Sequence, residues 1–177
     1  MKAKRTYPFV PKSSRWLTPG DFWAIPLRDG SFACGRVVEL MPQGMPGARV
    51  GFLGGLLDWH GSSEPTEASI AGASFIAQGI MHILSITSAG GVILGHRVLD
   101  LDSLGSWTFI DGDKIQRGFD VVRPWRREDN KHFPTLSWWG YEVMQIQANQ
   151  YFVERKGKAR KSLWWLLSEM QRKSVSD

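Results

Sequence analysis

Only one cysteine, Cys34, occurs among the 177 residues of the chain, so no disulfide can form within it. A chain of this length buries enough apolar surface to fold without disulfides or a structural metal. The low cysteine content is typical of proteins from a reducing compartment. We expect Cys34 to be a small buried residue of a strand, because the sequence offers no base that would activate its thiol.

Long hydrophobic runs are also missing. The longest apolar stretch, residues 70–94, is interrupted by several glycine and polar residues and is too broken to span a membrane. The amino-terminal residues are basic and include Pro8 and Pro11 before any apolar run, so they lack the core of a secretion signal. The sequence therefore predicts a soluble, cytoplasmic protein without a membrane partner.

Motifs for catalysis, metal binding and nucleotide binding are absent as well. The histidines lack the spacing to one another or to cysteine that common zinc sites require. The glycine-rich residues 90–97 lack the Gly-Lys-Ser/Thr ending of a phosphate-binding loop, and no Gly-x-Ser-x-Gly nucleophile motif occurs. We therefore expect a non-enzymatic protein with no catalytic residue, no metal and no cofactor. An enzyme site assembled from dispersed residues is the alternative.

The most informative segment that is present covers residues 19–38. A short apolar strand leads into Asp29-Gly30, and a second apolar strand, which contains Cys34, follows. Asp and Gly tolerate the positive φ angles of a two-residue type I′ turn. This pattern predicts a β-hairpin with Asp29 and Gly30 at its tip.

Short motifs in this hairpin resemble the immunity protein 26 family of bacterial polymorphic toxin systems. The motifs are Gly20-Asp21-Phe22, Ile25-Pro26-Leu27, Asp29-Gly30 and Gly35-Arg36-Val37. The resemblance continues more loosely through residues 95–104 and 120–124, and it covers roughly the first 125 residues when ordinary loop variation is allowed. It implies a cytoplasmic protein that binds a cognate toxin domain and blocks it.

Glycine and proline divide the first two thirds of the chain into short segments, which favours strands over long helices. Beyond the hairpin, strands are expected at residues 49–57, 75–86, 91–99, 107–110 and 119–124. The pattern of residues 75–86 suits a buried helix equally well, but Gly79 is unfavourable inside a helix. We expect an α+β protein dominated by antiparallel strands, arranged as a curved sheet or a partly open barrel.

The carboxyl-terminal third has a different pattern. Residues 161–173 contain no Gly or Pro, and their leucines and Met170 recur at helical spacing, which predicts an amphipathic helix. Residues 138–153 satisfy neither period, and we interpret them as strands joined by a turn at Ala148-Asn149. The expected organisation is a β-rich, immunity-protein-like domain at residues 1–125 and an extension at residues 126–177 that packs on it and ends in the helix.

Aromatic and basic residues are abundant. The chain has nine tryptophans and a formal net charge of +5, and its basic residues concentrate at 123–127 and 155–161. So many indole N–H groups are difficult to bury with partners, and some tryptophans are expected on a contact surface. The predicted partner-binding residues, which fall in loops or off an apolar helix stripe, are Trp59, Trp125, Arg126, Arg127, Trp138 and Trp165. Burial in the core is the alternative for each tryptophan.

Two binding functions suit this surface. The first is an inhibitor that occludes a cognate toxin, with about 800 Å² buried on each partner. Because the inhibitor is basic, it would need an acidic or largely apolar toxin surface. The alternative is a nucleic-acid-binding module that uses basic and aromatic residues, whose affinity would fall steeply with added salt.

Overall fold

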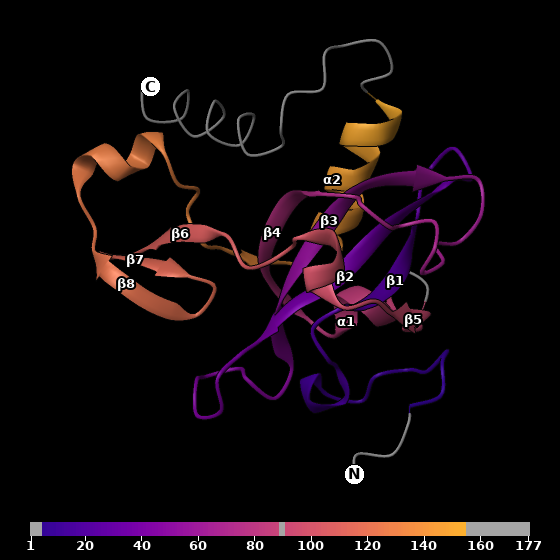
Figure 1. The fold of residues 1–177 in the computed structure, drawn as a ribbon, viewed down its shortest axis with the longest axis horizontal. Helices are drawn as coiled ribbons and strands as arrows, with labels where there is room; N and C mark the ends of the chain where they lie inside the picture. Colours follow the sequence, from indigo (N-terminus) through magenta and orange to yellow (C-terminus); the bar gives the residue numbers. More distant parts are fainter. Residues whose placement is uncertain (1–4, 89–90, 155–177) are drawn as a thin grey trace.

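The computed structural model describes residues 5–88 and 91–154 of the chain (Figure 1). These residues form an α+β fold of mostly antiparallel strands in two sheets, a six-stranded sheet and, to one side of it, a three-stranded sheet. The strand order of each sheet ends at two different strands, so neither sheet closes into a barrel. The predicted fold class is confirmed, with open sheets.

The six-stranded sheet has the strand order β5-β1-β2-β3-β4-β9. Neighbouring strands pair antiparallel, except that β9 lies parallel to β4. The strands are β1 (Asp21–Pro26), β2 (Phe32–Leu40), β3 (Gly51–Gly61), β4 (Phe75–His82), β5 (Gly95–His96) and β9 (Trp138–Trp139). The two edge strands, β5 and β9, are therefore very short, which limits the pairing of this sheet with other chains.

The three-stranded sheet is an antiparallel meander with the order β6-β7-β8. Its strands are β6 (Thr108–Asp111), β7 (Lys114–Arg117) and β8 (Asp120–Pro124). Phe109 of β6 and Phe119, just before β8, are buried in the same apolar cluster as Phe22 of β1 and Leu53 of β3. The two sheets are therefore joined by a shared core.

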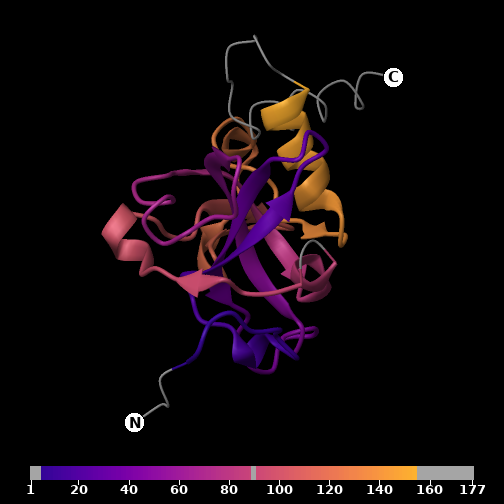
Figure 2. The same ribbon diagram turned by 90° about the vertical axis from the view of Figure 1, so that its right-hand side faces the viewer.

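The helices are short. They are α1 (Leu84–Thr87), α2 (Val143–Ala148), the π-helical η4 (Asn149–Val153) and the 3₁₀ helices η1 (Ser14–Trp16), η2 (Leu99–Asp102) and η3 (Arg127–Lys131). Figure 2 shows α2 standing against one side of the six-stranded sheet. Within residues 5–88 and 91–154, no helix has both the length and the apolar content to cross a bilayer. The helix predicted at residues 161–173, with the predicted contact residue Trp165, lies outside the described residues.

The six-stranded sheet has a separate core on each face. Phe52 of β3 lies in one apolar cluster with Met144 of α2 and Phe152 of η4. The next residue, Leu53, lies in the other cluster, which includes Phe109 of the three-stranded sheet. Because successive strand side chains face opposite sides of a sheet, both faces are buried and the central strands are nearly continuously apolar.

The predicted hairpin at residues 19–38 is present as β1 and β2, but its turn differs from the prediction. The N–H of Leu27 donates to the C=O of Ser31 at 2.8 Å, and the N–H of Gly30 donates to the C=O of Leu27 at 3.1 Å. Within this loop only Gly30 has a positive φ, +82°. Asp29 instead accepts a hydrogen bond from the Ser31 N–H. The loop therefore has three residues and a glycine bulge, and the predicted type I′ turn is wrong.

Most other predicted strands are present with shifted ends. The strand predicted at residues 49–57 is β3 and extends further, while the segment 75–86 divides into β4 and α1. The strand predicted at residues 91–99 is reduced to the two residues of β5. Ile93, in the same predicted segment, makes an isolated antiparallel bridge to Phe9 outside the named strands.

The prediction of strands and a turn at residues 138–153 is wrong beyond β9, because α2 and η4 occupy the rest of this segment. Met144 and Ala148 are buried one helical turn apart, a spacing that the exposed aromatic residues before them obscure. Asn149 does not turn the chain. Its side-chain oxygen accepts a hydrogen bond from the Arg28 N–H at 2.8 Å, which ties the helix to the β1–β2 loop.

Two strand glycines lie directly under tryptophan rings. A Cβ atom at Gly35 of β2 would collide with the ring of Trp23, its partner on β1, and a Cβ atom at Gly79 of β4 would collide with the indole of Trp139. Both tryptophans are buried. Glycine at these positions lets the rings lie flat on the neighbouring strand, and the second pair fixes the short strand β9 against β4.

Candidate functional site

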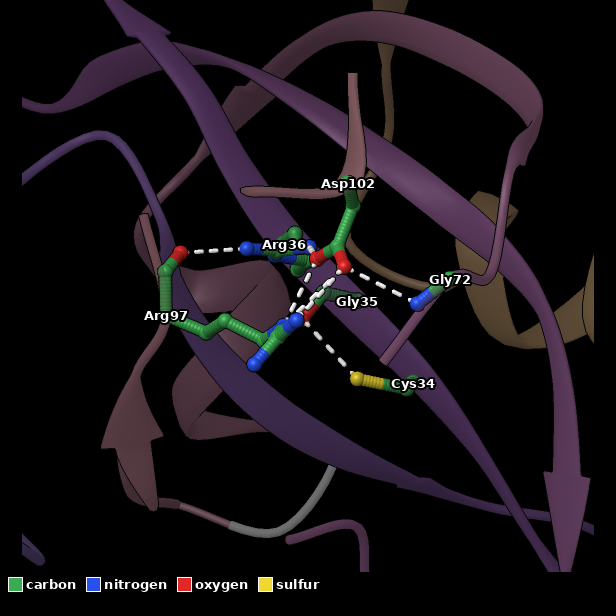
Figure 3. Close-up of polar contacts among 6 residues, drawn as sticks. All are labelled: Cys34, Gly35, Arg36, Gly72, Arg97 and Asp102. Carbon is green, nitrogen blue, oxygen red and sulfur yellow. Dashed lines mark hydrogen bonds and ion pairs between the residues drawn. The ribbon is translucent and has the colours of Figure 1, made fainter. Parts of the chain in front are cut away.

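Three charged side chains, Arg36, Arg97 and Asp102, link β2 to the segment that follows β5 (Figure 3). Arg36 is fully buried; its Nη1 lies 2.9 Å from the carboxylate of Asp102, and its Nη2 donates to the C=O of Arg97. Arg97 donates to Asp102 from Nε and from Nη2, each at 2.9 Å. The backbone N–H of Gly72 also donates to Asp102, at 2.9 Å. We call these three side chains the Arg36 network.

The Arg36 network keeps Asp102 ionised. The hydrogen bonds from Arg97 hold the pKa of Asp102 well below its usual range, although burial acts in the opposite direction. The N–H of Gly72 and the guanidinium of Arg36 lower this pKa further. Both carboxylate oxygens are already used by donors within the protein. The network therefore holds η2 against the sheet and has no oxygen left to act as a base.

A second buried carboxylate, Asp21 of β1, lies beside β5. It accepts hydrogen bonds from the hydroxyl of Tyr7 and from the N–H of Thr18, both at 2.9 Å, and its Oδ1 lies 3.1 Å from Nδ1 of His96. Burial, followed by the hydrogen bond to Asp21, raises the pKa of Tyr7 to about 12. Tyr7 therefore stays protonated and ties the amino-terminal segment to β1.

A cavity of about 730 Å³ opens next to this carboxylate. Its lining combines apolar, acidic and basic side chains: Arg5, Tyr7, Thr18, Phe22, Glu64, Pro65, Thr66, Glu67, Leu94, Gly95 and His96. Among residues 5–88 and 91–154, no three His, Cys, Asp or Glu side chains are grouped so that they could hold a metal ion. The ionisable groups nearest the sheet are bonded to one another, which suits a structural role.

Cys34 lies on β2 inside the core. It is fully buried, and this burial raises the pKa of its thiol far above the usual range. A protonated thiol without solvent access is a poor nucleophile. The prediction that Cys34 is a small buried residue is confirmed.

The opposite edge of the six-stranded sheet exposes aromatic side chains. Trp138 of β9 is 54% exposed. Its ring packs on two glycines: a Cβ atom added at Gly47 would lie 3.0 Å from the ring edge, and one added at Gly51 would lie 2.9 Å from it. Tyr141, three residues later, is 51% exposed and packs edge-on against His82 at 5.5 Å between ring centroids. Gly51 of β3 and His82 of β4 are register partners, so Trp138 on Gly51 and Tyr141 on His82 lie near each other.

Leu84 completes this exposed area. Its side chain is 40% exposed, and its backbone N–H donates to Nδ1 of His82 at 3.0 Å. Since Nδ1 accepts a hydrogen bond, it carries no proton, and the proton of the neutral ring is on Nε2. We call the side chains of Trp138, Tyr141, His82 and Leu84 the Trp138 surface.

A hollow of about 540 Å³ adjoins the Trp138 surface at Gly47. It lies between η1 and the loop that joins β2 to β3, and Arg15 and Arg49 contribute to its walls. Both arginines are exposed, and neither makes an ion pair with another residue in the part of the chain that the structure describes. The hollow therefore has uncompensated positive charge next to an apolar surface.

The model of the immunity protein 26 family matches residues 18–120, more than half of the chain. The chain belongs to the immunity protein 26 family. No matching protein was found among the curated proteins or among the solved structures. In this immunity protein the matched residues include Asp21 and the whole Arg36 network, whereas Trp138 and Tyr141 follow the match. The family resemblance predicted from the hairpin motifs is thereby confirmed.

The immunity protein does not bring its predicted contact residues together. Trp59 is half-buried at the far end of β3 from Gly51, about eight residues or roughly 26 Å along the strand. Trp138, by contrast, lies over Gly51. Trp59 and Trp138 are therefore at opposite ends of the six-stranded sheet.

Trp125, Arg126 and Arg127 lie elsewhere, where β8 leads into η3. Trp125 is 37% exposed and its Nε1 donates to Asn130 at 3.2 Å, while the side chains of both arginines are exposed. Nearby, the hydrogen bonds from Arg123 lower the pKa of Asp129 to about 2, so this carboxylate is ionised and anchors η3. These residues form a second exposed area on the three-stranded sheet.

Sequence reasoning missed Tyr141, Leu84, Arg15 and Arg49 of the immunity protein. No local pattern groups them, because they come from four separate segments. The pairing of β3, β4 and β9 and the hydrogen bond from the Ser14 N–H to the Arg49 C=O bring these segments together. The only available signal was the short spacing between Trp138 and Tyr141 on either side of Gly140. That spacing was interpreted as part of a strand.

Proposed function

We propose that this immunity protein binds a cognate bacterial toxin and neutralises it by covering the active or functional surface of the toxin. The supporting observation is the family match over residues 18–120. The geometry supports a binding function rather than catalysis, because the buried carboxylates of Asp21 and Asp102 already accept hydrogen bonds from groups within the protein. The proposed place of action is the cytoplasm.

Occlusion requires a rigid surface of sufficient area. A typical stable complex buries about 800 Å² on each partner. The six-stranded sheet has a core on both faces, so the surface that it presents is formed before the toxin arrives. Binding then loses little conformational entropy, which favours high affinity.

Co-expression tests this function. The probe is the product of the gene adjacent to that of the immunity protein, expressed in a sensitive bacterial host with and without the immunity protein. We expect survival only in its presence, and co-purification of the two proteins. The control is an inactivated toxin, which should be harmless alone and still co-purify. Cell death despite expression of the soluble immunity protein, or the absence of a complex, would overturn the proposal.

Nucleic-acid binding is the second candidate, favoured by the exposure of Trp125 next to Arg126 and Arg127. Affinity from phosphate contacts falls steeply with salt. We expect no shift of single-stranded DNA or RNA by the purified protein at low ionic strength. A shift that disappears on adding salt, together with failure to protect cells, would favour this second candidate.

A further inference from the structure

We propose that the cognate toxin docks on the Trp138 surface and the adjoining hollow, through an apolar side chain flanked by at least one carboxylate. This inference rests on the function proposed above and adds the contact surface and the chemistry of the partner. Neither Trp138 nor Tyr141 is within the segment that the family model matches. The two aromatic residues of the surface therefore lie beyond the shared segment, whereas His82 and Leu84 lie within it.

The exposed area is the first argument. Trp138, Tyr141 and Leu84 are large apolar residues that remain at least 40% exposed. Tyr141 and Leu84 each contact His82, and His82 pairs in register with Gly51, on which Trp138 packs. Aromatic residues of this kind are enriched at the centres of protein interfaces. An apolar group of the toxin placed here would remove water from all three side chains at once.

Rigidity is the second argument. The neighbouring residue, Trp139, is buried, its indole lies over Gly79, and its Nε1 donates to the hydroxyl of Ser137 at 3.2 Å. These contacts fix the backbone of β9, and the glycines beneath the Trp138 ring support one of its sides. Because Trp138 is already held in place, the toxin does not have to order it.

Charge is the third argument, and it selects the partner. Arg15 and Arg49 line the hollow next to Trp138 and have no ion-pair partner among the described residues. The chain has a net charge of +5. A carboxylate of the toxin in the hollow would gain charge-assisted hydrogen bonds, and complementary charge would also speed association.

The test measures the affinity of purified variants for the inactivated toxin. We expect Trp138→Ala to weaken binding by about 30-fold or more, the effect of an interface hot spot, and Tyr141→Ala to weaken it by about 10-fold. Trp125→Ala is the matched control, because it removes an exposed tryptophan from the other sheet; its affinity is expected to stay within about threefold of the wild type. Thermal unfolding of each variant confirms that the fold is intact.

The charge argument has its own variant. The double change Arg15→Glu and Arg49→Glu is expected to weaken binding by about 10-fold or more at low salt and to abolish the decrease in affinity that added salt causes in the wild type. An unchanged affinity with an unchanged salt dependence would overturn the proposed acidic partner.

The outcomes separate this inference from the proposed function. If the wild type binds and protects but Trp138→Ala and Tyr141→Ala bind as well as it does, the surface is wrong and the function stands. Loss of binding in Trp125→Ala alone would move the contact to the three-stranded sheet. If the wild type itself neither binds nor protects, both proposals fail.

Discussion

The two edges of the six-stranded sheet, at β5 and at β9, carry different residue types in opposite environments. Beside β5, charged side chains are buried and bonded to one another, as in the pair of Arg36 and Asp102 at 2.9 Å. Beside β9, two aromatic side chains, Trp138 and Tyr141, are about half exposed. Arg36, Arg97 and Asp102 lie within the family match, whereas Trp138 and Tyr141 lie after it.

This contrast explains what the family resemblance represents physically. Gly20-Asp21-Phe22, Gly35-Arg36-Val37 and the looser segment at residues 95–104 meet in space: His96 pairs with Asp21, and Asp102 binds Arg36. A buried network of ion pairs and hydrogen bonds fixes the relative position of these segments. The motifs that identify the family therefore build its scaffold, and we infer that recognition of a particular toxin resides outside them.

Removal of Arg36 gives the largest expected effect on the β5 side. Arg36→Met would leave the C=O of Arg97 without the guanidinium that donates to it and would remove the buried ion-pair partner of Asp102, leaving Arg97 and Gly72 as its donors. We expect the free energy of unfolding to fall by about 3–5 kcal/mol, as for other broken buried ion pairs. Urea unfolding followed by tryptophan fluorescence measures this value.

The control for Arg36→Met is Arg28→Met, which removes an exposed ion pair with Glu154. Its cost is expected to stay below about 1 kcal/mol, because solvent screens exposed pairs. The assignment of Arg36 to the scaffold would be contradicted if Arg36→Met had the same free energy of unfolding as the wild type but no longer bound the toxin. The Arg36 network would then be part of the contact surface.

A smaller effect is expected where the β9 side is attached to the sheet. Gly79→Ala places a methyl group against the indole of Trp139, and overpacking of this kind costs about 1–3 kcal/mol. Because Trp139 precedes the helix and follows Trp138, the variant is also expected to bind the toxin less tightly. Unfolding and affinity are measured on the same preparation.

Gly105→Ala is the matched control, since its added methyl group meets nothing within 4 Å. Its stability is expected to stay within about 0.5 kcal/mol of the wild type. Equal stabilities of the Gly79 and Gly105 variants would show that β9 is not held by the Trp139 contact.

The smallest expected effect is a loss of folding stability at low pH, and it concerns Asp102 on the β5 side. The pKa of Asp102 is lowered by Arg97 in the folded protein, whereas an unfolded Asp has a pKa of about 3.9. Below that pH the unfolded chain takes up a proton that the folded chain does not, so stability is lost as pH falls. The contribution of Asp102 is expected to decrease by about 1 kcal/mol between pH 5 and pH 3.

Asp102→Asn provides the reference for this pH effect. The variant is expected to be less stable than the wild type at pH 5, and its unfolding free energy is expected to decrease less between pH 5 and pH 3. Parallel pH curves for the two proteins would contradict an ionised Asp102 in the folded state. The other carboxylates are present in both proteins, so their contributions cancel in the difference.

Local patterns account for much of the fold. Two apolar segments on either side of Asp29-Gly30 predicted the β1–β2 hairpin and the burial of Cys34, both of which are present. The turn of the hairpin was predicted incorrectly, because Leu27 and Ser31 extend the pairing and convert a two-residue turn into a three-residue loop. The helix α2 was missed because its buried face is completed by a sheet contact that no local pattern contains.

Local sequence patterns predicted much less of the candidate site than of the fold. Trp138 was among the predicted contact residues, and it is the most exposed tryptophan of the described residues. Its neighbours Tyr141, Leu84 and Arg49 were not predicted. Leu84 is more than fifty residues away from Trp138 along the chain, and only the parallel pairing of β9 with β4 brings the two segments together.

The sequence alone determined the family, the β-rich fold class and the first hairpin, because these depend on short motifs and on short apolar segments divided by glycine and proline. The tertiary structure alone decided which charges are buried together at Arg36 and which aromatics remain exposed around Trp138. Burial and exposure depend on contacts between distant segments, and those contacts exist only once the sheet has formed.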